Sequence, residues 1–173
     1  MIPYNLKRIK AIALDVDGVL SPSTIPLLGT NGIPARMANI KDGYAIQLAV
    51  RSGLRFAIIS GARNLAVEAR YEGLGVEDIY MGSAMKIDVF NAWLKERDLQ
   101  PEDVLYMGDD IPDLQVMAAC GCPCAPADAA PEVQAAALYV SPKDGGHGCV
   151  RDVVEQVLKA QGKWLATDKA FGW

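Results

Sequence analysis

The chain has 173 residues, of which 51% are hydrophobic and 22% charged, with a formal net charge of −4. This size and apolar content suit a single domain over residues 1–173. No basic run could neutralise a line of phosphates, which argues against a nucleic-acid partner. No apolar run approaches the roughly 18 residues of a membrane span, and residues 1–10 do not resemble a signal peptide. We therefore expect a cytoplasmic protein that is not bound to a membrane.

Strands and helices are predicted to alternate along the chain. Residues 9–14 form an apolar run ending at Asp15, as expected of a parallel strand buried on both faces. Apolar residues at helical spacing predict a helix over 41–52. The same rhythm gives strands over 55–60, 76–80, 104–107 and 139–140, and helices over 65–72, 84–97, 113–119 and 151–161. This order predicts an α/β fold: a doubly wound, three-layer parallel sheet with ligands at the carboxyl ends of its strands.

Residues 21–40 are expected to form a projecting β-hairpin. The stretch contains several prolines and the pair Asn31-Gly32 between short apolar segments, which is a strong hairpin signal. Neither this stretch nor residues 61–86 is long enough to hold a separate cap domain. The fold is therefore predicted to be capless.

The cysteines have a spacing that also suits a soft-metal site. Pro123 interrupts the group, however, and no Cys/His pair stands nearby to complete a tetrahedral site. We expect reduced thiols packed beside a strand. The residues concerned are Cys120, Cys122, Cys124 and Cys149.

Two acidic groups follow predicted strands. Asp15 and Asp17 stand two residues apart before Gly18, and a second group occupies residues 108–113. Taken singly, each acid could be a turn residue or a helix N-cap. Carboxylates at one edge of a parallel sheet repel each other unless a cation or a shared proton lies between them. Oxygen ligands without a nearby imidazole favour Mg²⁺, and His147 is expected to be an exposed loop residue.

A hydroxyl and an ammonium group complete this set. Ser60 and Gly61 end one strand, and Lys86 lies near the end of another. A phosphoryl group with charge on three oxygens requires such hydrogen-bond donors and positive charge. Together with the acids, they indicate phosphoryl chemistry.

The motifs occur in a recognisable order. DVDGV at 15–19, SG at 60–61, Lys86 and GDDIPD at 108–113 resemble the motifs of the haloacid dehalogenase superfamily. Over almost the whole chain, residues 9–164, the sequence resembles the 3-deoxy-D-manno-octulosonate 8-phosphate phosphatases. That resemblance rests on IKDGYAIQLAV at 40–50, GDDIPDLQVM at 108–117, GGHGCVRDVV at 145–154 and AQGKW at 160–164.

The resemblance implies a magnesium-dependent phosphatase that acts through an aspartyl-phosphate. Asp15 would be the nucleophile, and Asp17 the general acid and then the base. The Asp15 side chain, the Asp17 backbone carbonyl and Asp109 would hold Mg²⁺. Asp110 and Asp113 would orient Lys86 and the metal-bound waters.

The resemblance also implies how the substrate is held. Ser60, Gly61 and Lys86 would bind the phosphoryl oxygens, and basic residues would meet the sugar carboxylate; the candidates are Arg63, Arg70 and Arg151. A homotetramer is implied, with the hairpins assembled together and the C-terminal tail, residues 162–173, reaching into an adjacent site. The pathway implied is lipopolysaccharide biosynthesis.

Two departures bear on the sugar. Ala62 stands where related phosphatases commonly have a basic residue, and His147 stands where a basic residue is frequent. A nine-carbon 2-keto-3-deoxy sugar acid 9-phosphate is therefore an alternative substrate. A receiver domain and a phosphosugar mutase are alternatives to the phosphatase. Asp17 disfavours the receiver, because an acid/base there speeds hydrolysis, and the missing cap disfavours the mutase.

Overall fold

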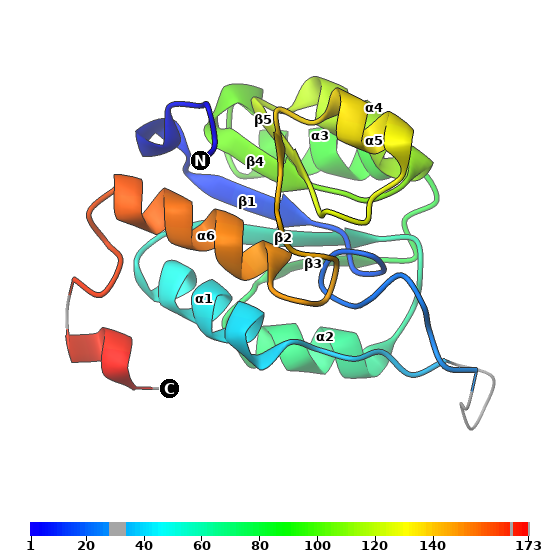
Figure 1. Ribbon diagram of the computed structural model, residues 1–173, viewed down its shortest axis with the longest axis horizontal. Helices are drawn as coiled ribbons and strands as arrows, with labels where there is room; N and C mark the ends of the chain where they lie inside the picture. The colour runs from blue at the N-terminus through cyan, green and yellow to red at the C-terminus, as the bar shows by residue number, and fades with distance from the viewer. Residues whose placement is uncertain (28–33, 167, 173) are drawn as a thin grey trace.

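The computed structural model describes residues 1–27, 34–166 and 168–172. Its central layer is a six-stranded parallel sheet in the order β3-β2-β1-β4-β5-β6 (Figure 1). The strands are β1 (Ala11–Leu14), β2 (Arg55–Ser60), β3 (Asp78–Met81), β4 (Val104–Met107), β5 (Cys122–Ala125) and β6 (Tyr139–Val140). All the strand pairs are parallel, as the alternation of strands and helices predicted.

Helices cover both faces of the sheet, so the predicted three-layer architecture is confirmed (Figure 1). One layer holds α1 (Ile40–Arg51), α2 (Leu65–Glu72) and α6 (Cys149–Ala160). The other holds α3 (Lys86–Glu96), α4 (Leu114–Ala119) and α5 (Pro131–Ala136). Short 3₁₀ segments at Leu6–Arg8, Pro101–Asp103, Ile111–Asp113 and Asp168–Phe171 complete the elements.

The side chains of strand β1 are divided between the two core layers of the sheet. Successive side chains of a strand point to opposite faces. Ile12 and Leu14 accordingly join the core beneath α1 and α6, whereas the small residues of β1 face the other layer. There they leave room for Phe90 and Trp93 of α3, whose rings are fully buried. All four residues of β1 are buried, which explains its uninterrupted apolar sequence.

The topology places a switch point between β1 and β4. From β1 the chain moves to β2 and β3 on one side, and then crosses to β4 on the other side of β1. Ligands bind at the carboxyl ends of strands at such a point. Leu14 is in register with Ile58 of β2 and with Met107 of β4, so the residues that follow these strands share one edge.

The hairpin predicted over residues 21–40 is not confirmed. The tip of the expected hairpin, at Asn31-Gly32, lies outside the described residues. The described flanks, 22–27 and 34–39, form no strand. Pro22, Pro26 and Pro34 lack the N–H group that a ladder needs. In the described part of the chain, only α2 and β3 lie between β2 and α3, in keeping with a capless fold.

The other predicted elements agree with the structure to within a few residues, and β5 and α5 are the two elements of the sheet and its helical layers for which no range was predicted. The cysteines are free and buried, and Cys122 and Cys124 lie on β5 within the core, as the packing interpretation expected. Within the described ranges, no helix has the length and apolar character needed to span a membrane.

Asp42 joins α1 to α6. It lies in the first turn of α1, and its Oδ1 accepts a hydrogen bond of 2.6 Å from the backbone N–H of Arg151, in the first turn of α6. Gly148, the residue before α6, has a left-handed backbone (φ 104°) and offers no side chain as a cap. Burial raises the pKa of Asp42 to about 6, while hydrogen bonds from the N–H groups of Arg151 and Gly148 oppose that rise. Asp42 therefore supplies the cap that α6 lacks locally.

We predict that Asp42→Ala lowers the free energy of unfolding by about 1–2 kcal/mol, because the first turn of α6 loses its acceptor. Urea unfolding followed by circular dichroism measures this change. Glu96→Ala, on the exposed end of α3, is the control and should change stability little. Equal stability of the two variants would contradict the capping role.

Candidate active site

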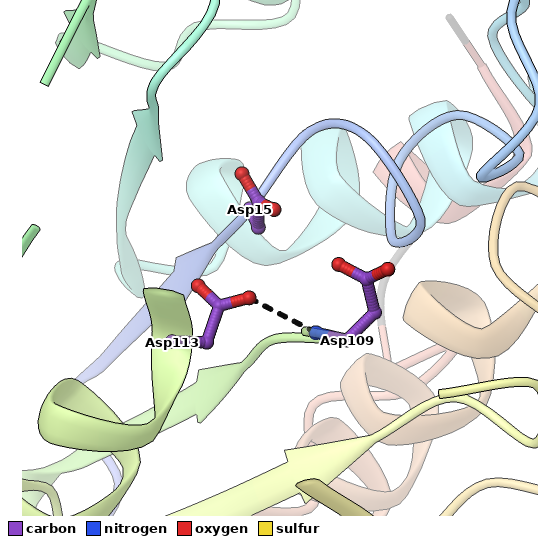
Figure 2. Close-up of side chains that lie close together, drawn as sticks. All are labelled: Asp15, Asp109 and Asp113. Atoms are coloured by element: carbon purple, nitrogen blue, oxygen red, sulfur yellow. Dashed lines mark hydrogen bonds between the residues drawn. The ribbon is translucent and has the colours of Figure 1, made fainter. Parts of the chain in front are cut away.

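Three aspartates converge at the switch point (Figure 2). Asp15 follows β1 directly, Asp109 follows β4 after Gly108, and Asp113 ends the 3₁₀ turn before α4. One carboxylate oxygen from each residue lies within 4.8 Å of the others. The expectation that the two acidic groups meet at one edge of the sheet is confirmed.

Lys86 lies between two of these carboxylates. Its Nζ is 3.0 Å from Oδ2 of Asp15 and 2.7 Å from Oδ1 of Asp113, and its side chain is buried. Burial by itself would lower the pKa of Lys86, but the charges of Asp15 and Asp113 outweigh burial and raise it. Lys86 therefore remains a cation inside the site.

Asp113 is fully engaged by hydrogen bonds. Its Oδ1 accepts from Lys86 Nζ and from the Tyr106 hydroxyl at 2.6 Å. Its Oδ2 accepts from the backbone N–H groups of Asp109 at 3.1 Å and Asp110 at 3.3 Å, the first of which is drawn in Figure 2. Asp113 thus holds the loop after β4 in place, and the exposed Asp110 caps the 3₁₀ turn. Neither oxygen of Asp113 is left for a strong metal bond.

The electrostatics of the cluster call for a divalent cation. Burial, and then the charge of Asp113, raise the pKa of Asp15 to about 7. Burial, and then the charge of Asp15, raise the pKa of Asp109 to about 8. Three carboxylates face one ammonium group, so the ionised cluster has an excess of negative charge. An all-oxygen site with this charge suits Mg²⁺, with Asp15 and Asp109 as the available carboxylates.

Glycines allow the loops to approach this closely. A Cβ at Gly18 would lie 1.9 Å from Oδ2 of Asp109, and the backbone there is left-handed (φ +86°). A Cβ at Gly145 would lie 1.9 Å from the carbonyl oxygen of Gly18. The glycine-rich loop before α6 therefore packs directly on the loop that carries Asp17. His147 in that loop is exposed, as expected, and its Nδ1 lies 2.7 Å from the Gly145 carbonyl oxygen.

Asp17 makes an ion pair that the sequence did not reveal. Both of its carboxylate oxygens accept hydrogen bonds of 2.9 Å from Arg36, through Nε and Nη2. Arg36 is not among the residues that the sequence singles out, because it lies in the proline-containing segment expected to form the hairpin and belongs to no recognised motif. No local signal in the sequence could have indicated this long-range contact.

Ser60 lies where the sequence placed it, at the end of β2 and beside Gly61. It is 2% exposed, and its Oγ accepts a hydrogen bond of 3.2 Å from the N–H of Ala62. Register places Ser60 two residues past Ile58, the partner of Leu14. Asp15, Ser60 and Asp109 thus emerge from three adjacent strands at the same edge.

The three candidate arginines are dispersed. Arg63 is exposed and lies over Gly82, after β3. Arg70 is half-buried on α2, and its Nη2 would be 2.5 Å from a Cβ at Gly43. Arg151 stacks 4.5 Å from the centroid of the Trp164 ring and bonds to Glu155. Among the described residues, none of the three forms an ion pair with the clustered aspartates.

The fold and the site together define a phosphoryl-transfer class. A family model described as haloacid dehalogenase-like hydrolase matches residues 61–151, more than half of the chain. The parallel sheet, the acids after β1 and β4, and the lysine at the start of α3 therefore belong to a haloacid dehalogenase-like hydrolase.

Curated and solved relatives narrow this class. The chain is 41% identical over 157 residues to the 3-deoxy-D-manno-octulosonate 8-phosphate phosphatase KdsC of Escherichia coli K12, covering 91% of this chain and 83% of the relative. The structure of such a phosphatase from Moraxella catarrhalis, in complex with magnesium, phosphate and KDO, has a TM-score of 0.90 at 32% identity, covering 97% and 96% of the two chains. A cobalt-bound phosphatase of this kind from Haemophilus influenzae has a TM-score of 0.89 at 31% identity, covering 96% and 98%. The chain belongs to the 3-deoxy-D-manno-octulosonate 8-phosphate phosphatase family.

We predict that, without divalent metal, the protein loses stability as pH rises from about 5 to about 8. The pKa values of Asp15 and Asp109, about 7 and about 8, lie above their unfolded value of 3.8, so the folded state holds protons that the unfolded state has released. This stability is fully present below pH 3.8 and is lost as pH rises toward the folded pKa values, by roughly 1.4 kcal/mol per pH unit for each proton that only the folded state holds. The loss levels off above about pH 8, where both carboxyl groups are ionised in the folded state as well.

Thermal unfolding in EDTA over this pH range measures the effect. Millimolar Mg²⁺ should flatten the dependence, because a bound cation replaces the protons. Asp109→Asn should also reduce the slope, whereas Asp98→Asn, at an exposed position, should retain it. A slope unchanged by Mg²⁺ would show that this cluster is not the metal site.

Proposed function

We propose that this protein is a Mg²⁺-dependent phosphatase that hydrolyses 3-deoxy-D-manno-octulosonate 8-phosphate to the sugar acid and phosphate. The observation that carries the proposal is the buried Asp15 beside Lys86 and Asp109 at the switch point of the sheet. The named activity of relatives that match this chain over most of its length supports the substrate.

Asp15 is the proposed nucleophile. Mg²⁺, held by Asp15, the backbone carbonyl of Asp17 and Asp109, would keep these carboxylates ionised and polarise the phosphoryl group. An Asp15 oxygen attacks phosphorus as the bond to the sugar oxygen breaks, which leaves an aspartyl-phosphate on Asp15. Asp17 gives its proton to the leaving oxygen, and then takes one from the water that hydrolyses the intermediate.

The remaining groups of the site position this reaction. Lys86, Ser60 and the backbone at Gly61 are proposed to bind the phosphoryl oxygens, whose charge Lys86 offsets. Asp113 fixes Lys86 through the hydrogen bond of 2.7 Å, and Asp110 holds the turn that carries Asp113. We propose that Asp110 and Asp113 act on these neighbours rather than on the substrate.

The alternative substrate is a nine-carbon 2-keto-3-deoxy sugar acid 9-phosphate. Ala62 favours it, because its short side chain leaves space beside Ser60 where a longer sugar could extend. A receiver-like phospho-acceptor domain is the more remote alternative, since the full set of a nucleophile, an acid/base and a fixed lysine fits turnover better than storage of a phosphoryl group.

We further propose a single catalytic domain over residues 1–173 that acts in the cytoplasm as a homotetramer. In a capless fold the site needs cover from elsewhere. The segment at 21–40 and the tail at 162–173 of neighbouring subunits are the proposed cover. Within one chain, the tail lies against α1, where the Tyr44 hydroxyl donates to the Ala170 carbonyl and Arg51 Nη1 donates to that of Gly172.

We predict that Asp15→Asn lowers turnover of the octulosonate 8-phosphate by at least about a thousandfold, because the covalent route is lost. Phosphate release in Mg²⁺ measures the rate, and EDTA should abolish the wild-type activity until Mg²⁺ is restored. The isosteric variant Asp98→Asn is the control. Retention by Asp15→Asn of more than about a tenth of wild-type turnover would refute the assignment of the nucleophile.

Deletion of residues 166–173 is predicted to raise KM for the octulosonate 8-phosphate more than KM for 4-nitrophenyl phosphate, which has no distal part to hold. Light scattering should give a mass four times that of the 18.6 kDa chain. An equal effect on the two substrates, or a monomeric wild-type protein, would contradict the shared site.

A further inference from the structure

Arg36 lies beside the proposed acid/base and has no role in the mechanism described so far. Its side chain is only 10% exposed, and its Nε and Nη2 donate to Oδ1 and Oδ2 of Asp17. Both distances are 2.9 Å. Two parallel N–H···O bonds of this kind are the arrangement in which guanidinium groups typically bind carboxylates. Arg36 thus presents a well-formed carboxylate-binding fork on the side of the site where Asp17 lies.

The backbone that carries Arg36 is held from several directions. Nη1 of Arg36 donates to the Pro34 carbonyl at 2.8 Å, and Nδ2 of Asn64 donates to the same carbonyl at 3.1 Å. On the far side, Nδ2 of Asn39 donates to the Gly146 carbonyl at 3.1 Å. These bonds join residues 34–39 to α2 and to the glycine-rich loop, so Arg36 is positioned by the fold rather than by chance on the surface.

A cavity of about 150 Å³ lies next to this fork. Arg36 and Arg70 both line it, together with Val16 and Tyr71. A second cation beside the same space adds positive potential on this side of the site. The two arginines come from segments far apart in sequence, the 34–39 stretch and α2.

The present partner of Arg36 conflicts with the proposed chemistry of Asp17. To protonate the leaving oxygen, Asp17 must turn toward the substrate and carry a proton, whereas a two-bond contact with a guanidinium needs both of its oxygens as acceptors. The contact must therefore open for turnover. A sugar acid brings its own carboxylate, which has the same shape and charge as the group that Arg36 now holds.

We propose that Arg36 is a specificity residue that binds the carboxylate of the substrate, with the Asp17 carboxylate as its stand-in when no substrate is bound. This inference rests on the proposed function. Substrate binding exchanges one carboxylate for the other at Arg36, and the exchange frees Asp17 for the leaving oxygen. Phosphate esters without a carboxylate cannot make this exchange.

The first experiment compares Arg36→Ala and Arg36→Lys with wild type on three substrates: octulosonate 8-phosphate, a pentose 5-phosphate and 4-nitrophenyl phosphate. For Arg36→Ala, KM for the octulosonate ester should rise at least about tenfold, while kcat/KM for the two esters without a carboxylate should not fall and should rise if release of Asp17 from Arg36 limits their turnover. Arg36→Lys keeps the charge but loses the two-bond geometry, so its KM for the octulosonate ester should lie between the values of wild type and Arg36→Ala. Arg8→Ala, which removes an arginine–carboxylate contact with Asp103 at the opposite end of the sheet, is the matched control.

The second experiment measures binding of the free sugar acid, 3-deoxy-D-manno-octulosonate, by calorimetry. Asp17→Asn removes the competing carboxylate and should lower the Kd several-fold although activity is lost, and Arg36→Ala should raise it. A purely structural ion pair would give no gain in binding from Asp17→Asn.

The outcomes separate the two proposals. Equal loss on all three substrates would show that Arg36 binds the phosphoryl group or only supports the fold, and would overturn the inference, as would unchanged sugar-acid binding in both variants. If Arg36→Ala does not fold, Arg36→Lys and Asp17→Asn still decide the question. If wild type shows no preference for the octulosonate ester, the proposed function fails instead.

Discussion

The structure depends on holding several carboxylates together at the end of a parallel sheet. Like charges at this distance repel, and burial strengthens the repulsion. The protein offsets it with one buried lysine and with hydrogen bonds that occupy Asp113 completely. The negative charge of Asp15 and Asp109 is not fully compensated by these groups, so the site stabilises a bound cation or a proton. The same imbalance that costs stability without metal therefore creates the affinity for metal.

The sheet makes this concentration of charge possible. β1 and β4 are neighbours, and the register that sets Leu14 beside Met107 brings the residues after both strands to one edge. Behind them, apolar side chains fill both faces of the sheet, so the loops have a rigid base. Close contacts at Gly18 and Gly145 then draw the loops together beyond what side chains would permit. Precision in the site thus derives from the core and from missing Cβ atoms as much as from the charged groups.

The core of the site was predictable from sequence because each part has a local signal. An apolar run followed by an acid marks the end of a buried strand, and parallel strand ends meet, so the pattern of residues alone pairs Asp15 with Asp109. Lys86 was identified as the ammonium group near a strand end and as part of the ordered set of superfamily motifs. Tyr106 was predicted only as part of the strand over 104–107, and its bond to Asp113 depends on which face of β4 it occupies. The Asn-Gly signal for a hairpin was purely local, and the prolines in the same segment lack the N–H groups that a strand ladder needs. Arg36 was missed because the path of 34–39 is set by contacts with Asn64 and the glycine-rich loop.

The aromatic cluster over α1 gives the protein an internal optical reporter. Trp164 meets Tyr44 edge to face at 6.3 Å and lies under the Arg151 guanidinium, whereas Trp93 is sealed in the opposite core layer. The indole of Trp164 therefore senses whether the first residues of the tail rest on their own chain, while Trp93 is shielded from that event. In a Trp173→Phe variant, which removes the third tryptophan of the chain, quenching by a small solute would distinguish these two indoles by their accessibility. Movement of the tail toward a neighbouring subunit could in this way be followed by its emission, without any label.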